Sequence, residues 1–187
     1  TLGKAYCYQI TPGATLFFDE PMNLYAGAGA LGVCYDDYNA DNFDHAKLDF
    51  IHGAVISMTQ TGKRPIESNA VMPGTPAWGA DFKKASIHAF NRSLGIGAQG
   101  ASMPYRYNYL SLDDTYKDAY GLPLLRMTYN FTDQDRALFA FITGKIEEAA
   151  RAMNPKGMVS KPNAKDYNIV PYQTTHNTGG TLMGESP

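Results

Sequence analysis

The residue pattern best suited to chemistry lies near the end of the chain, at Pro171 to Gly184, which reads PYQTTHNTGGTLMG. It places the imidazole of His176 among hydroxyl and amide side chains, directly before the Gly179-Gly180 pair. Histidine exchanges protons near neutral pH, and adjacent glycines allow a tight turn and a close approach of the backbone to a flat ligand. The segment therefore suits proton transfer, but a polar turn whose histidine caps backbone groups would contain the same residue types.

A glycine motif at Gly27 to Gly32 fits the G-x-G-x-x-G pattern of dinucleotide-binding folds. That motif needs a β-branched strand before it and a helix after it, so that a pyrophosphate can bind at the helix N-terminus. Here Glu20 to Asn23 precedes the motif and Asp36 to Asn42 follows it, and both stretches are typical of turns. A close-packed glycine turn is the favoured interpretation over a dinucleotide site.

An acidic run after this motif resembles the start of a calcium-binding loop, because Asp37, Asn39 and Asp41 alternate. In an EF-hand the sixth position is glycine and the twelfth is glutamate, whereas here they are Asn42 and Leu48. Asn and Asp side chains that bond their own backbone explain the run without a metal.

Two histidines, His45 and His52, lie seven residues apart with no third ligand at a useful spacing. Zinc sites need at least three protein ligands in a recognisable pattern. Both histidines are therefore predicted to be structural, and no metal site is predicted.

Aromatic residues offer candidate sugar contacts in two places. The irregular stretch at residues 61 to 79 carries the single tryptophan, Trp78, which can either border a sugar site or pack in the core. Tyr105, Tyr107 and Tyr109 alternate, which predicts that part of this stretch is a half-buried strand. Its tyrosines form either a binding platform or a sheet face that packs on a helix.

The elements that must position these residues alternate between strands and helices. Apolar alternation predicts an edge hairpin within residues 1–18, a strand at 50–59 and an antiparallel pair within 105–131. A helix is predicted at 81–93 with Asp81 as its cap, and a second begins at Thr132-Asp133-Gln134-Asp135 with a capping-box-like start. The second carries an apolar stripe up to Met153, which should cover the sheet.

Composition describes an ordinary globular domain rather than a disordered or nucleic-acid-binding chain. Of the 187 residues, 44% are hydrophobic and 18% are charged, and the formal net charge is −2 with no basic stripe. No apolar run approaches the roughly 18 residues of a membrane span. Cys7 and Cys34 allow at most one internal disulfide, and their spacing does not show whether it forms.

Several motifs together resemble the glucose–methanol–choline (GMC) family of flavin oxidoreductases, in particular its bacterial gluconate, sorbitol and related polyol dehydrogenase branch. The resemblance is carried by YQTTHNTGGTLMG near the end and by other stretches in the same order. These stretches are Gly27 to Gly32 followed by Asp36 to His45, Arg64 to Ser68, Met103 to Arg106, and Gly121 to Arg126.

The resemblance implies an α+β fold with an antiparallel β-sheet flanked by helices, which is the substrate-binding region of such an enzyme without its N-terminal dinucleotide-binding part. Residues 1–170 would form this region, and residues 171–187 would begin the C-terminal active-site segment that returns to the flavin domain. The chain begins without Met and ends three residues after Gly184, so we expect a piece of a longer enzyme that is inactive by itself.

The resemblance also implies roles for individual residues. His176 would be the general base of an FAD-dependent alcohol, polyol or sugar-acid dehydrogenase, accepting the hydroxyl proton while hydride leaves for the flavin. The stretch Asn177, Thr178, Gly179 and Gly180 would contact the cofactor. Trp78 from the loop, with Tyr105 and Arg106 from the Met103 to Arg106 motif, would contact the substrate.

The resemblance to the polyol dehydrogenase branch also implies what this protein binds and assembles with. These partners are a polyol or sugar-acid substrate, the remainder of the parent chain, a haem-containing electron-transfer subunit and a small subunit, in a periplasmic or membrane-associated setting. The residues themselves leave open the exact substrate and whether the enzyme is a dehydrogenase or an oxidase. A non-catalytic carbohydrate-binding or interaction domain is the alternative, since 13 tyrosines and nine phenylalanines could bind sugars without catalysis.

Overall fold

The computed structural model describes residues 2–24, 32–58, 70–168 and 175–184, and the statements below concern these residues. The strands are β1 (Cys7–Tyr8), β2 (Gly13–Phe17), β3 (Val33–Tyr35), β4 (Ala54–Met58), β5 (Ser93–Gly100), β6 (Tyr109–Lys117), β7 (Pro123–Thr128), β8 (Gly157–Ser160) and β9 (Asn177–Thr178). The helices are α1 (Gly79–Phe90) and α2 (Asp133–Ala152).

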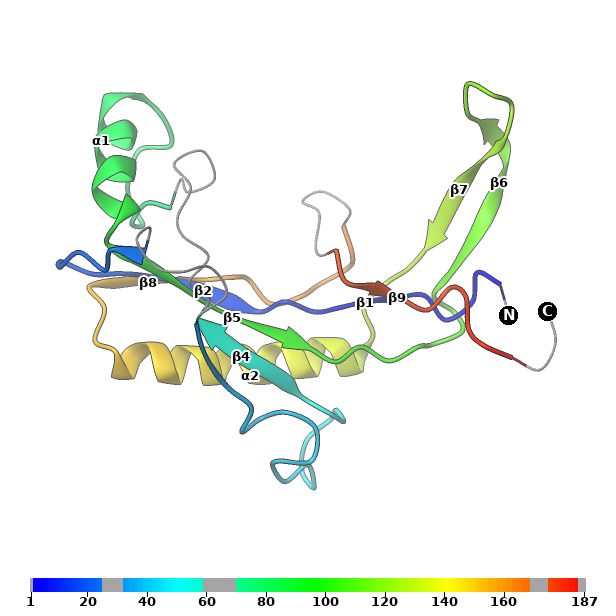
Figure 1. Ribbon diagram of the computed structural model, residues 1–187, viewed down its shortest axis with the longest axis horizontal. Helices are drawn as coiled ribbons and strands as arrows, with labels where there is room; N and C mark the ends of the chain where they lie inside the picture. Colours follow the sequence, from blue (N-terminus) through cyan, green and yellow to red (C-terminus); the bar gives the residue numbers. More distant parts are fainter. Residues whose placement is uncertain (1, 25–31, 59–69, 169–174, 185–187) are drawn as a thin grey trace.

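A five-stranded antiparallel sheet in the order β3-β4-β5-β2-β8 forms the centre of the molecule (Figure 1). Its central register pairs Leu16 with Leu94, and Ile56 with Ala98. All four side chains are buried. Because alternate side chains of a strand point to opposite faces, one face of this sheet is apolar and the other is free to carry polar residues and glycines.

Helix α2 lies along the apolar face of the sheet (Figure 1). Leu138, Ile142 and Ile146 recur at helical spacing and are fully buried against the sheet residues. The helix begins with a capping box in which the Thr132 hydroxyl accepts from the Asp135 backbone N–H and the Asp135 carboxylate accepts from the Thr132 N–H. The predicted helix start and its apolar stripe are therefore confirmed.

Helix α1 packs at one end of the sheet and buries only Ala89 (Figure 1). The prediction that Asp81 caps this helix is wrong, because the N-cap is Trp78, which makes no side-chain hydrogen bond to the helix. Asp81 lies in the first turn instead. There its negative charge still interacts favourably with the helix dipole.

The N-terminal hairpin predicted within residues 1–18 does not form. β1 pairs with β9, whereas β2 lies between β5 and β8 inside the main sheet. A local apolar pattern identifies strands but not their partners, and here each strand finds its partner far along the chain.

The antiparallel pair predicted within residues 105–131 is confirmed as the β6–β7 hairpin, which projects from the molecule (Figure 1). The half-buried strand predicted in part of the stretch with three alternating tyrosines is confirmed only from Tyr109 onward, where β6 begins. Tyr105 and Tyr107 lie in a turn that is closed by a hydrogen bond from the Asn108 N–H to the Tyr105 carbonyl. The buried Asn108 side chain fixes this turn by donating to the Asn130 carbonyl and accepting from the Asn130 N–H.

The architecture is α+β with antiparallel sheets, as predicted, although α2 alone covers a face of the main sheet. The predicted boundary between residues 170 and 171 lies outside the described residues, as does most of the Gly27 to Gly32 motif. None of the described helices has the length and apolar character needed to cross a membrane.

The buried Asp135 predicts a specific pH dependence of stability. Burial raises the pKa of its carboxyl group above the ordinary value, and hydrogen bonds from Thr132 only partly oppose this. The folded protein therefore holds this proton to higher pH than the unfolded chain. The protonated carboxyl group of Asp135 favours the folded state at pH values below the pKa that it has in the unfolded chain. This contribution to stability is lost as pH rises through the higher pKa that it has in the folded protein.

We expect Asp135→Asn, which cannot titrate, to flatten the fall in unfolding free energy as pH rises through the mildly acidic range. Urea denaturation at several pH values measures this. The control is Asp133→Asn in the same helical turn, where the carboxylate is fully exposed, and it should leave the profile nearly unchanged. Equal profiles for wild type and Asp135→Asn would contradict the prediction.

Candidate functional site

The segment that contains His176 is held to the rest of the molecule by backbone pairing with the N-terminus. Asn177 and Thr178 of β9 pair antiparallel with Tyr8 and Cys7 of β1. The pairing continues beyond the short strands, because the Gly180 N–H donates to the Lys4 carbonyl at 2.9 Å.

The N-terminal segment is itself paired on its other side with the start of β6. The Leu110 N–H donates to the Gly3 carbonyl at 2.7 Å, and the Tyr6 N–H donates to the Asn108 carbonyl at 3.0 Å. Residues 2–8, which we call the N-terminal bridge, therefore lie between the His176 segment and the β6–β7 hairpin. The N-terminal bridge therefore fixes the position of the His176 segment relative to the β6–β7 hairpin.

The backbones of β9 and the N-terminal bridge approach each other very closely at Gly179. Gly179 has φ of +72°, and a Cβ atom at this position would lie 1.7 Å from the Ala5 carbonyl oxygen. Ala5 is itself buried with a positive φ of 57°. No side chain fits at position 179 unless the two segments separate, so this glycine serves close backbone packing within the chain.

The two cysteines are not bonded to each other. Cys7 is buried in β1, and its thiol donates to the Ala5 carbonyl and lies beside the Thr178 side chain. Burial raises the pKa of this thiol, and the Thr178 contact only partly opposes the shift. Cys34 is exposed on β3, in a different sheet. The sequence left open whether Cys7 and Cys34 form a disulfide, and the structure shows that they do not.

A pocket of about 480 Å³ lies where β9 meets the base of the β6–β7 hairpin. One wall is the stretch Asn177 to Thr181, and the opposite wall is the hairpin face with Leu110, Leu112 and Leu125. Leu2 and Tyr6 of the N-terminal bridge complete the apolar part. Peptide groups on one side and leucine side chains on the other suit a flat, largely apolar ligand with polar edges.

His176 is exposed and immediately precedes β9, next to the residues that line this pocket. Its ring does not itself line the pocket. The four predicted cofactor contacts, Asn177 to Gly180, all lie on the pocket wall, so the structure brings them together in one place.

The three predicted substrate contacts are divided between two places. Tyr105 and Arg106 lie in the turn before β6, on the far side of the N-terminal bridge from β9. The rings of Tyr105 and Tyr107 stack there, with centroids 5.3 Å apart. Trp78 lies instead at the start of α1, well separated from β9 along the long axis (Figure 1), and is 84% exposed, which excludes the core-packing alternative.

The face of the main sheet that α2 does not cover is a candidate surface that the sequence analysis did not identify. A hollow of about 570 Å³ lies over it, and Thr15, Ser57 and Gln99 contribute polar groups to its lining. Gly95 and Gly97 lie on the same face and leave room above the strands. The alternation of these glycines and Gln99 with Leu94, Ile96 and Ala98 was the signal that could have revealed this face.

The ring of His45 has a structural role, as predicted, whereas His52 contributes its backbone carbonyl oxygen to the contact and the role of its side chain stays a prediction. A ring nitrogen of His45 bonds the His52 carbonyl oxygen at 2.6 Å, and the ring packs on Phe43 with centroids 4.1 Å apart. In the acidic run, the Asn42 amide donates to the Asp36 carbonyl, which is the local bonding expected from the sequence. Among the described residues no cluster of three or more potential metal ligands occurs.

Comparison with known proteins relates the whole chain to part of several oxidoreductases, although no protein-family model matches it. It is 40% identical over 190 residues to the gluconate 2-dehydrogenase flavoprotein of Pantoea cypripedii, in an alignment that covers 100% of this chain and 31% of that protein. It is 23% identical over 181 residues to the fructose dehydrogenase large subunit of Gluconobacter japonicus, covering 94% of this chain and 30% of that protein.

A third relative is the 2-methyl-1,2-propanediol dehydrogenase of Mycolicibacterium austroafricanum, 31% identical over 148 residues, with 75% of this chain and 26% of that protein covered. The chain thus spans less than a third of the length of these curated relatives. Their names are those of dehydrogenases acting on alcohols, sugars or a sugar acid, and one is named a flavoprotein.

The close packing at Gly179 predicts a large effect of a small substitution. Gly179→Ala places a methyl group against the Ala5 carbonyl, so β9 must move away from the N-terminal bridge, and we expect a loss of more than about 3 kcal/mol in unfolding free energy. Urea denaturation followed by circular dichroism measures it.

The matched control is Gly121→Ala at the tip of the β6–β7 hairpin. Gly121 has a similar φ of +83°, but no atom lies within 4 Å of the added Cβ. Only the strain of the left-handed backbone remains there, which costs about 1 kcal/mol. Equal losses for the two variants would show that the contact with Ala5 does not constrain β9.

Proposed function

We propose that this chain belongs to the glucose–methanol–choline family and forms the substrate-binding region and the start of the C-terminal active-site segment of an FAD-dependent dehydrogenase. The enzyme would oxidise a CH–OH group of a polyol or sugar acid. The observation that carries the proposal is the 40% identity, over the whole length of the chain, with a gluconate 2-dehydrogenase flavoprotein.

The pocket beside β9 supports a place for the flavin ring. Its wall offers the peptide groups of Asn177 to Gly180, and its opposite side offers leucine side chains, a combination that accepts a flat aromatic system with polar edges. The described residues provide only this wall, so in the proposed enzyme the pyrophosphate is held elsewhere. When bound, the flavin supplies the acceptor for the hydride that leaves the substrate carbon.

His176 is the proposed general base. An alcohol holds its proton too tightly to release it to water at neutral pH, so an imidazole that accepts this proton as the carbon is oxidised lowers the barrier. The exposed position of His176 leaves its ring accessible to a substrate, and the adjacent β1–β9 pairing holds its backbone in place. A ring nitrogen takes the hydroxyl proton and later passes it to solvent.

Substrate contacts are proposed from two surfaces of the chain. Tyr105 and Arg106 offer an aromatic face and a guanidinium donor group beside the N-terminal bridge, and the uncovered sheet face offers hydroxyl and amide groups from Thr15, Ser57 and Gln99. Such groups hydrogen-bond the hydroxyls of a sugar or polyol. Trp78 lies apart from β9, at the start of α1, and its contact with the substrate stays a prediction.

We further propose that the enzyme works in a multi-subunit assembly in the periplasm or at the membrane, with a haem-containing subunit that takes electrons from the flavin and a small subunit. One relative is named a large subunit, which indicates that it is part of a complex.

In the full-length enzyme with its flavin bound, His176→Ala should leave the flavin content unchanged and slow flavin reduction by the substrate by about 100- to 10,000-fold, the usual contribution of a positioned general base. Stopped-flow absorbance with gluconate and sorbitol as substrates measures the reduction rate. The control is His88→Ala, since His88 is exposed in the last turn of α1, and it should reduce at the wild-type rate.

An unchanged reduction rate in His176→Ala would remove the histidine from the mechanism. Sugar binding without any flavin in the purified protein would instead favour a non-catalytic carbohydrate-binding domain.

A further inference from the structure

The hollow over the uncovered sheet face has a cation at its edge, the ammonium group of Lys161. Lys161 directly follows β8, and its backbone N–H donates to the Gly13 carbonyl at 2.8 Å, so the β2–β8 pairing extends to this residue. The preceding residue, Ser160, faces α2, because its hydroxyl donates to Glu147 of that helix at 2.7 Å. Since side chains alternate along a strand, Lys161 lies on the opposite, uncovered face.

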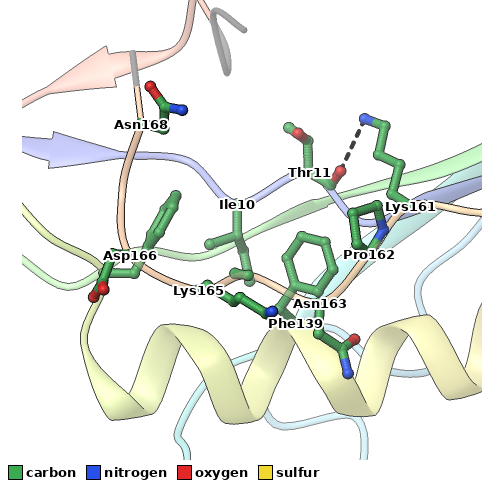
Figure 2. Close-up of a pocket in the computed structure, with 11 residues that line it drawn as sticks. Ile10, Thr11, Phe139, Lys161, Pro162, Asn163, Lys165, Asp166 and Asn168 are labelled. Carbon is green, nitrogen blue, oxygen red and sulfur yellow. Dashed lines mark hydrogen bonds between the residues drawn. The ribbon is translucent and has the colours of Figure 1, made fainter. Parts of the chain in front are cut away.

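The Lys161 side chain extends across the sheet surface toward the start of β2. Its Nζ atom donates to the Thr11 carbonyl oxygen at 3.0 Å, on the side of the chain away from α2 (Figure 2). Its Cε atom lies 3.8 Å from the position that a Cβ atom would take at Gly13. The ammonium group therefore lies close above the backbone of residues 11–13, at the edge of the hollow.

This ammonium group has donors left for a ligand. A lysine ammonium group can donate three hydrogen bonds, and the Thr11 carbonyl accepts one of them. Among the described residues no carboxylate forms an ion pair with Lys161, in contrast to Lys156, which pairs with Asp19. Burial also lowers the pKa of Lys161. A partly desolvated cation whose described partner is neutral gains more from a bound anion than a fully hydrated surface lysine does.

The rest of the hollow offers neutral hydrogen-bonding groups from Thr15, Ser57 and Gln99. Gly13 pairs with Gly97, and Gly97 pairs with Ser57 on the next strand. Because neighbouring strands lie about 4.8 Å apart, Ser57 is about 10 Å from Gly13 across the sheet. A cation at one edge and hydroxyl and amide groups spread over this length suit an elongated chain of hydroxyl groups that ends in an anion.

The cation also lies near the segment that carries the proposed general base. Tyr8 pairs with Asn177, which directly follows His176. Thr11 is only three residues after Tyr8, so the Cα atoms of these two residues are at most about 11 Å apart. The ammonium group at the Thr11 carbonyl and the His176 segment are therefore both positioned by residues 8–11.

We propose that Lys161 binds the carboxylate of an acidic sugar substrate, and that this ion pair makes the enzyme prefer sugar acids to neutral polyols. The inference rests on the proposed function, because it assigns one end of the substrate of that site. A neutral polyol offers the ammonium group only uncharged acceptors. A carboxylate offers two charged oxygens, while the hydroxyl groups of the same molecule bond with Thr15, Ser57 and Gln99.

The test compares gluconate with sorbitol, because gluconate has a carboxylate where sorbitol has a CH₂OH group. In the full-length enzyme with its flavin bound, Lys161→Gln should raise KM for gluconate by about ten-fold or more, with little change in kcat. The kinetics with sorbitol should stay unchanged. Lys161→Arg keeps the positive charge and should retain most of the preference for gluconate. Steady-state kinetics with an artificial electron acceptor measure these values.

Lys165→Gln is the matched control. Lys165 is an exposed lysine four residues further along the chain, and it does not line the hollow. This variant removes the same charge and should leave KM for gluconate unchanged. An equal rise of KM in Lys161→Gln and Lys165→Gln would reveal a general charge effect and overturn the proposal. Gluconate kinetics that are identical in Lys161→Gln and wild type would also overturn it.

A binding measurement separates the carboxylate site from the proposed reaction. Isothermal titration of the full-length His176→Ala enzyme should show gluconate binding at least about ten-fold more tightly than sorbitol, and adding Lys161→Gln should remove this preference. Equal affinities in His176→Ala alone would overturn the carboxylate site, even if Lys161→Gln folds poorly, and would leave the proposed dehydrogenase intact. Preferential binding of gluconate to an enzyme whose flavin neither substrate reduces would instead contradict the proposed function and uphold the carboxylate site.

Discussion

The position of the candidate site depends on one backbone ladder, in which the N-terminal bridge pairs with β9 on one side and with the start of β6 on the other. Short strands contribute few hydrogen bonds, so their alignment needs a further constraint. The crossing of Gly179 over the Ala5 carbonyl provides it, because a backbone packed at this distance cannot slip by one residue without a clash. The pocket beside His176 exists because this ladder brings the β9 segment against the hairpin.

One face of the main sheet packs in the hydrophobic core, and the other face lies at the surface. Helix α2 covers one face with Leu138, Ile142 and Ile146, which supplies the apolar burial that stabilises the domain. The other face has Gly95, Gly97 and small polar side chains beside Val159, so it is more polar than the face that α2 covers. A sheet stabilised from one side can leave its second face open to a ligand, since antiparallel sheets do not require cover on both faces.

Local features were predictable from the sequence, and long-range pairing was not. The capping box at Thr132 and the stripe of α2 were correctly predicted because both depend on residues within a few positions of each other. The partner of β1 was wrongly predicted because Cys7 pairs with Thr178, and no local pattern encodes such a distant contact. The tyrosine alternation correctly predicted a strand only from Tyr109 onward, since Asn108 binds Asn130 and holds the preceding residues in a turn.

The glycine pair after His176 shows why a motif and its structure must be interpreted together. The sequence predicted that Gly179 and Gly180 let the backbone approach a flavin, yet in the structure Gly179 first allows approach to the chain's own Ala5. The two roles are compatible, because a backbone held tightly on one side presents its other side as a rigid wall, and both glycines line the pocket. Packing against Ala5 therefore holds this pocket wall in one conformation before a ligand binds. A flat ligand that binds there then costs less conformational entropy.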